Sequence, residues 1–88
     1  MRNVEIYIKG RVQGVGFRYH TLEIAKEFNI NGFVRNITDG SVYIQAAGTK
    51  DEVESFIAWC NYGPRMAFVE SVKVFETDDK QFSDFSIR

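Results

Sequence analysis

The first third of the chain changes from a strand-like to a helix-like pattern of apolar residues. Apolar and polar residues alternate over residues 4–9, which predicts a half-buried strand. A glycine-bearing segment, residues 10–16, follows it. A helix is then predicted over about residues 17–29, because five apolar or small residues fall on one side at about 100° per residue. These residues are Thr21, Leu22, Ile24, Ala25 and Phe28.

The rest of the chain predicts a hairpin, a second helix and further strands. Residues 32–37 and 42–47 are strand-like and flank Thr38-Asp39-Gly40-Ser41, a hairpin-turn sequence. Residues 49–52 have the form of a helix-capping box, and an apolar stripe at i, i+3, i+4 and i+7 follows. Gly63-Pro64 ends that helix. Residues 68–75 predict a fourth strand, and residues 82–87 leave a short fifth strand open.

This order of elements, βαββαβ with an additional C-terminal strand, predicts an α+β fold. Split βαβ units of this kind form a ferredoxin-like sandwich, in which two helices cover one face of a mainly antiparallel sheet of four to five strands. The chain has 88 residues, 44% of them apolar, and contains no linker or repeat. We therefore expect residues 1–88 to form a single domain with one modest core. The fold alone does not define a function.

Composition and charge argue against several classes of protein. Cys60 is the only cysteine, so an intramolecular disulfide and a cysteine-rich zinc site are both excluded, and its place on the apolar stripe favours packing. No stretch approaches the roughly 18 apolar residues of a membrane span. The formal net charge of -1 does not favour binding to a polyanion. We therefore expect a cytoplasmic monomer with no membrane or nucleic-acid partner, no cofactor and no metal. Residues 78–80 are interpreted as a polar connector.

Arg18 and the loop before it form the first candidate site. Arg18 falls in the first turn of the predicted helix, where the positive end of the helix dipole disfavours a cation, and on the same side as Leu22 and Ala25. Its side chain must therefore reach solvent or face an anion. A loop with three glycines that leads into a helix can turn successive backbone N–H groups towards a phosphate. A solvated arginine after a simple glycine turn explains the spacing equally well, and the loop is neither a Walker A nor a dinucleotide motif.

Asn36 is the second candidate. If Val34 faces the helices, Asn36 does too, near the C-terminal end of its strand. A right-handed crossover would bring that end towards the start of the first helix. Opening the turn at residues 38–40 is nevertheless the more ordinary role for an asparagine at this position.

Read together, two segments resemble the signatures of the acylphosphatase family. The first signature resembles residues 10–18, GRVQGVGFR, and the second resembles residues 32–36, GFVRN, with the glycines at 40 and 48. Residues 63–64, 67–69 and 85–87 are also similar to family positions, so the resemblance covers nearly the whole chain. Two departures, Phe33 where many members have Trp and Gly16 where some animal forms have Cys, do not touch the expected chemistry.

The resemblance implies metal-free hydrolysis of small acyl phosphates to a carboxylate and inorganic phosphate. It implies that Asn36 orients the attacking water, and that Arg18 holds the phosphate together with backbone N–H groups of the loop. The loop residues are Gln13, Gly14, Val15, Gly16, Phe17 and Arg18 itself. The leaving carboxylate needs no general acid, because its conjugate acid has a pKa of about 4. An amide is not a base, so the proton would leave through the substrate phosphate, the route that the family is thought to use, or to bulk water.

Other polar residues are not assigned to this site. His20 is the only histidine, and the helical wheel places it on the polar face, where we expect an exposed and structurally neutral side chain. Arg11 and Arg35 would add positive potential near the phosphate, but solvated surface positions are the more common outcome for such residues. Asp39 is expected to serve the hairpin turn.

Two other functions stay open at this point. Tyr7, Phe33 and Tyr43 share one parity and would stack bases on the uncovered sheet face, as in RNA-recognition domains, although residues 32–35 do not complete that family's aromatic motif. The closer alternative is a non-catalytic or accessory acylphosphatase-like module, of the kind that forms the N-terminal domain of the large hydrogenase-maturation carbamoyltransferases. There the residue after the signature arginine is typically proline, whereas this chain has Tyr19, which favours the independent enzyme.

Overall fold

A five-stranded sheet and two helices make up the structure, a computed structural model that describes residues 1–78 and 80–88. Residue 79 of the expected polar connector therefore lies outside the described residues. The elements in chain order are β1 Arg2–Arg11, α1 Phe17–Glu27, β2 Asn31–Asn36, β3 Val42–Gly48, α2 Lys50–Tyr62, β4 Phe68–Glu76 and β5 Phe85–Ile87.

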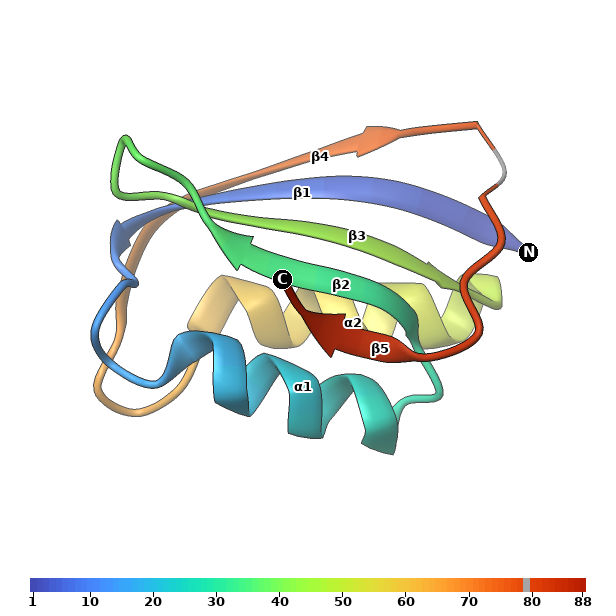
Figure 1. Cartoon of the computed structure of the whole chain (residues 1–88), viewed down its shortest axis with the longest axis horizontal. Coiled ribbons are helices and arrows are strands. Elements are labelled where there is room, and N and C mark those ends of the chain that lie inside the picture. Colours follow the sequence, from blue (N-terminus) through green and yellow to red (C-terminus); the bar gives the residue numbers. More distant parts are fainter. Residues whose placement is uncertain (79) are drawn as a thin grey trace.

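The strand order in the sheet is β4-β1-β3-β2-β5. Neighbouring strands are antiparallel, except that β5 pairs with β2 in parallel. Both helices lie on the same face of the sheet, and the C-terminus comes to rest beside the end of β2 (Figure 1). The prediction of a mainly antiparallel ferredoxin-like sandwich is confirmed, and the fifth strand forms.

The alternation predicted for the first strand is confirmed, but the strand is longer than predicted. Val4, Ile6 and Ile8 are buried in the core between the sheet and the helices. β1 then continues to Arg11, two residues into the segment expected to be a loop, because a bulge after Lys9 lets residues 10–11 pair with β4. The loop that precedes α1 is therefore short and fixed at both ends, which matters for the candidate site.

Both helix ends have a local explanation. α1 ends two residues before the predicted limit, since Asn29 adopts a positive φ of 58°. The amide of Ile30 then donates to the Ala25 carbonyl at 2.8 Å, and that of Asn29 donates to the Lys26 carbonyl at 3.3 Å, the pattern of a Schellman motif. The capping box before α2 is confirmed: the Glu52 amide donates to Thr49 Oγ1, and the Thr49 amide donates to the Glu52 carboxylate.

Candidate active site

The loop between β1 and α1 is shaped by two glycines in the left-handed region. Gly14 has φ 74° and Gly16 has φ 76°, a conformation that favours glycine and turns the intervening backbone sharply. Gly16 is also the N-cap of α1 and makes no side-chain cap hydrogen bond. The first backbone N–H groups of α1 therefore have no capping side chain, and the positive end of the helix dipole is open to an anion.

Phe17 fixes the start of α1, and Arg18 projects from that fixed point. The Phe17 ring is 1% exposed and its centroid lies 5.6 Å from that of Trp59 on α2. Thr21 Oγ1 donates to the Phe17 carbonyl oxygen at 2.7 Å, which adds a buried bond within this turn. Arg18 is exposed, and the ion pairs among the described residues all involve Arg2. The Arg18 guanidinium thus keeps an uncompensated positive charge at the end of the loop.

Asn36 closes β2 and faces the same side of the sheet as Val34, as the parity argument predicted. Val34 is fully buried against the helices, and Asn36 is half-buried at the end of the strand. The Asn36 Oδ1 atom is buried, yet no described residue donates a hydrogen bond to it. An unpaired buried acceptor costs roughly 1–3 kcal/mol, so this carbonyl oxygen is suited to a donor that is not part of the protein.

These groups surround one cavity of about 210 Å³. Its lining residues are Val12, Gly14, Gly16, Phe17, Arg18, Tyr19, Asn36 and Ile87. The structure therefore brings together five of the seven residues predicted for the site.

Gln13 and Val15 are the two predicted residues that do not line the cavity. The Gln13 side chain turns towards the β2–β3 connection, and Val15 packs partly buried against the core. Three lining residues were not predicted. Val12 lies within the first signature and Tyr19 directly follows it. Ile87 reaches the site only because β5 pairs with β2, a contact for which the sequence carries no local signal.

Three polar residues that were not assigned to the site also do not line the cavity. His20 is exposed as expected, but it is not structurally neutral, because its Nδ1 atom lies 2.8 Å from the carbonyl oxygen of Gly16. Arg11 is exposed and does not line the cavity. Arg35 lies over the Tyr43 ring, 5.3 Å from its centroid, on the uncovered face of the sheet. Arg35, like Arg11, does not line the cavity.

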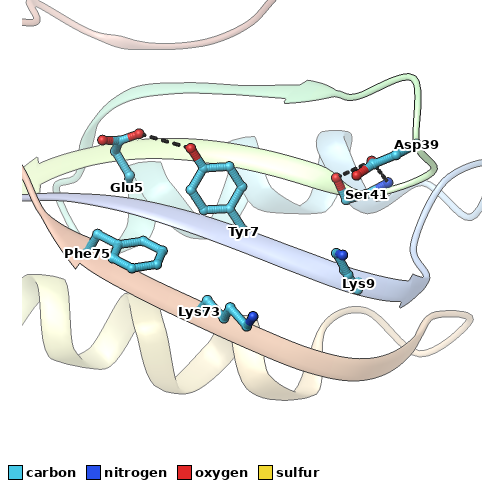
Figure 2. Close-up of a pocket in the computed structure, with 7 residues that line it drawn as sticks. All are labelled: Glu5, Tyr7, Lys9, Asp39, Ser41, Lys73 and Phe75. Atoms are coloured by element: carbon cyan, nitrogen blue, oxygen red, sulfur yellow. Dashed lines mark hydrogen bonds between the residues drawn. The ribbon is translucent and has the colours of Figure 1, made fainter.

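A wider hollow of about 650 Å³ lies away from this site, on the uncovered face of the sheet (Figure 2). Both of its carboxylates are occupied by neighbouring side chains. Glu5 accepts hydrogen bonds from the hydroxyls of Tyr7 and Tyr43, and Asp39 accepts from the Ser41 hydroxyl and amide, which confirms its role in the turn. These hydrogen bonds lower the pKa of Asp39. No residue of the glycine loop borders the hollow, so the smaller cavity is the better candidate for chemistry.

The aromatic residues on the uncovered face of the sheet test the RNA-binding alternative. Tyr7, Phe33 and Tyr43 do share it, and the Tyr43 centroid lies 5.0 Å from that of Tyr7 and 5.9 Å from that of Phe33. However, Phe33 is only 7% exposed and Tyr43 only 6%. The Arg88 guanidinium covers Phe33 at 4.4 Å from the ring centroid. Base stacking needs open ring faces, so this arrangement argues against a stacking platform.

Fold and cavity together define a class: a small α+β protein with a cavity that is lined by an arginine and by an unpaired amide oxygen. Residues 4–87 match the family described as Acylphosphatase. The chain therefore belongs to the acylphosphatase family, and it is a hydrolase of acyl phosphates.

Individual relatives agree with this membership. Acylphosphatase from Shewanella amazonensis is 48% identical over 88 residues, which cover 99% of this chain and 97% of that one. The crystal structure of acylphosphatase from Bacillus subtilis is similar with a TM-score of 0.96 and 35% identity, covering 100% and 99% of the two chains. Full-length HypF in its phosphate- and nucleotide-bound form is similar with a TM-score of 0.89 and 31% identity, but this chain covers 12% of that larger one. Among the described residues, no helix is long and apolar enough to cross a membrane.

Proposed function

We propose that Arg18 and the loop N–H groups hold the phosphoryl group of an acyl phosphate while Asn36 orients the attacking water. The observation that carries this proposal is the buried, unpaired Oδ1 atom of Asn36 in the cavity that Arg18 also lines. A water molecule that donates one hydrogen to Oδ1 would have a lone pair directed away from that bond. The amide therefore supplies direction to the nucleophile without taking its proton.

The charge around the cavity suits phosphoryl transfer. Arg18 is the charged side chain among the lining residues, and a guanidinium matches two phosphate oxygens in a fork. The uncapped start of α1 adds backbone N–H donors next to it. In phosphoryl transfer, positioning and stabilisation of charge on the equatorial oxygens provide most of the catalysis. The site is therefore equipped for the reaction without a covalent intermediate.

The proton balance follows from the side chains that line the cavity. The lining residues that the structure describes include no carboxylate, histidine or lysine, so they offer no general base. Water attacks phosphorus, the bond from phosphorus to the acyl oxygen breaks, and the carboxylate leaves with the bonding electrons. We propose that the proton of the water passes to a phosphate oxygen of the substrate or to solvent. No general acid is needed, because a carboxylate is a stable leaving group.

The proposal also covers the domain organisation, oligomeric state and location of the enzyme. Residues 1–88 would act as one domain, since most of the buried apolar residues form a single core cluster between sheet and helices. We also propose a monomer in the cytoplasm. Its free thiol, Cys60, is fully buried, and burial raises the thiol pKa well above its usual range, so the thiolate is disfavoured.

Separate measurements of binding and turnover test the two roles. Asn36→Ala should lower kcat for acetyl phosphate by about 10²–10³-fold, while inorganic phosphate binds with nearly unchanged affinity. Arg18→Ala should weaken phosphate binding itself. Isothermal titration with inorganic phosphate gives the affinities, and circular dichroism establishes that each variant is folded. Full turnover by folded Asn36→Ala would remove Asn36 from the mechanism.

A further inference from the structure

The side chain of Gln13 joins the two halves of the candidate site. Its Nε2 atom donates to the carbonyl oxygen of Ile37 at 2.7 Å and to that of Ser41 at 2.8 Å, 24 and 28 residues further along the chain. Ile37 directly follows Asn36, and Gln13 belongs to the loop that ends at α1. One amide group thus connects the loop before Arg18 with the turn that follows Asn36.

The orientation of this amide is chemically unambiguous. Both partners are backbone carbonyl oxygens, which only accept hydrogen bonds, so the NH₂ end of the amide must face them. Its two hydrogens match the two acceptors. The half-buried side chain therefore has one arrangement that satisfies all three groups, and a carboxylate or a thioether of the same length would not reproduce it.

The turn that receives these bonds is already closed by its own backbone. The Ile37 amide donates to the Ser41 carbonyl at 2.9 Å, and the Gly40 amide donates to the Ile37 carbonyl at 3.0 Å. Neither carbonyl would lose its last partner if the Gln13 side chain were shortened. The contribution of Gln13 is therefore the link between loop and turn, rather than the formation of the turn.

We propose that Gln13 is a positioning residue that sets the distance between the bound phosphate and Asn36. This inference rests on the function proposed for Arg18 and Asn36. The loop N–H groups and Arg18 belong to one continuous segment, so they would shift together if the link were lost. Phosphate binding would then be kept, while the water oriented by Asn36 would no longer be aligned with phosphorus. A misplacement of about 1 Å can cost on the order of 10²-fold in rate.

Gln13→Met tests the proposal, because it keeps length and removes both donors. We expect kcat for acetyl phosphate to fall at least about tenfold, with the affinity for inorganic phosphate changed by less than about threefold. Gln13→Asn keeps the donors but places them on a side chain that is too short to reach both carbonyls. It should lower kcat as Gln13→Met does, and it replaces that variant if Gln13→Met does not fold. Gln45→Met is the matched control, since Gln45 donates to the Tyr43 hydroxyl away from the cavity and should keep full turnover.

A double-mutant cycle separates positioning from a general structural role. In the Asn36→Ala background, Gln13→Met should cause no more than about a twofold further loss, because the residue it positions is absent. Three results would each overturn the proposal. The first is an undiminished kcat in Gln13→Met, and the second is a loss of phosphate affinity as large as the loss of kcat. The third is the full loss of kcat from Gln13→Met when it is added to Asn36→Ala. Full activity of Asn36→Ala alone would instead refute the function on which the inference rests, so the two failures are distinguishable.

Discussion

Arg18 in the first turn of α1 and Asn36 at the last position of β2 line the same cavity. The β1-α1-β2 crossover explains this relationship. α1 runs back along the sheet before β2 begins, so the start of the helix and the end of the strand lie at the same end of the sheet (Figure 1). The residue proposed to bind phosphate and the residue proposed to orient water thus come from two regular elements, α1 and β2, that border one cavity.

The exposed His20 should not act as a base. His20→Ala should lower kcat by less than about fivefold, because it removes only the contact with the Gly16 carbonyl, whereas loss of a general base costs about 10²–10⁴-fold. A pH profile of kcat for wild type and variant checks this. A pH profile of kcat whose shape differs between wild type and His20→Ala would contradict the expectation.

Gly32 in β2 should be intolerant of a side chain. Its φ is 142°, and a Cβ atom there would overlap the backbone carbonyl oxygen of Gln45 on β3. Gly32→Ala should therefore lower the free energy of unfolding by about 3 kcal/mol or more, measured by urea denaturation. Gly40→Ala is the control, since φ is also positive there but a Cβ would meet no atom within 4 Å. Equal losses for both variants would show that backbone strain alone, without the overlap, governs Gly32.

The capping box before α2 should contribute stability and not activity. Thr49→Ala removes the side-chain acceptor of the Glu52 amide and should cost about 1 kcal/mol, which corresponds to a Tm lower by roughly 4–8 °C. Thr49→Ser should restore most of that loss. Below the Tm, kcat for acetyl phosphate should equal that of wild type, because Thr49 does not line the cavity. A large change in kcat would contradict this expectation.

Tyr43 should titrate at unusually high pH. Burial and then its hydrogen bond to Glu5 raise the pKa of Tyr43 to about 12. The pKa of Tyr43 in the folded state lies above the usual value of about 10. Protonated Tyr43 therefore contributes to the free energy of unfolding below pH 10, and this contribution is lost as the pH rises through about 12. Ultraviolet titration should show one tyrosine ionising near pH 12, and Tyr43→Phe should remove it. A Tyr43 that titrates near pH 10 would contradict this environment.

The features of the site that depend on neighbouring residues could be predicted from the sequence, whereas the contacts between distant segments could not. The glycine loop, the start of α1 and the parity of Asn36 with Val34 follow from patterns within a few residues. The two hydrogen bonds of Gln13 and the place of Ile87 do not, because they join segments far apart in the chain. The contact of His20 with Gly16 was also missed, since a helical wheel gives the direction of a side chain but not its rotamer.

Arg18 is proposed to hold the phosphoryl group of an acyl phosphate in this cavity. The most direct test follows acetyl phosphate by phosphorus NMR in EDTA with wild type, Arg18→Ala and Arg18→Lys, each established as folded. We expect rapid hydrolysis by wild type, a loss of on the order of 10³-fold for Arg18→Ala, and a partial loss for Arg18→Lys, which keeps the charge but not the planar fork. Hydrolysis by Arg18→Ala at the wild-type rate, or wild-type activity that needs a divalent ion, would contradict the account.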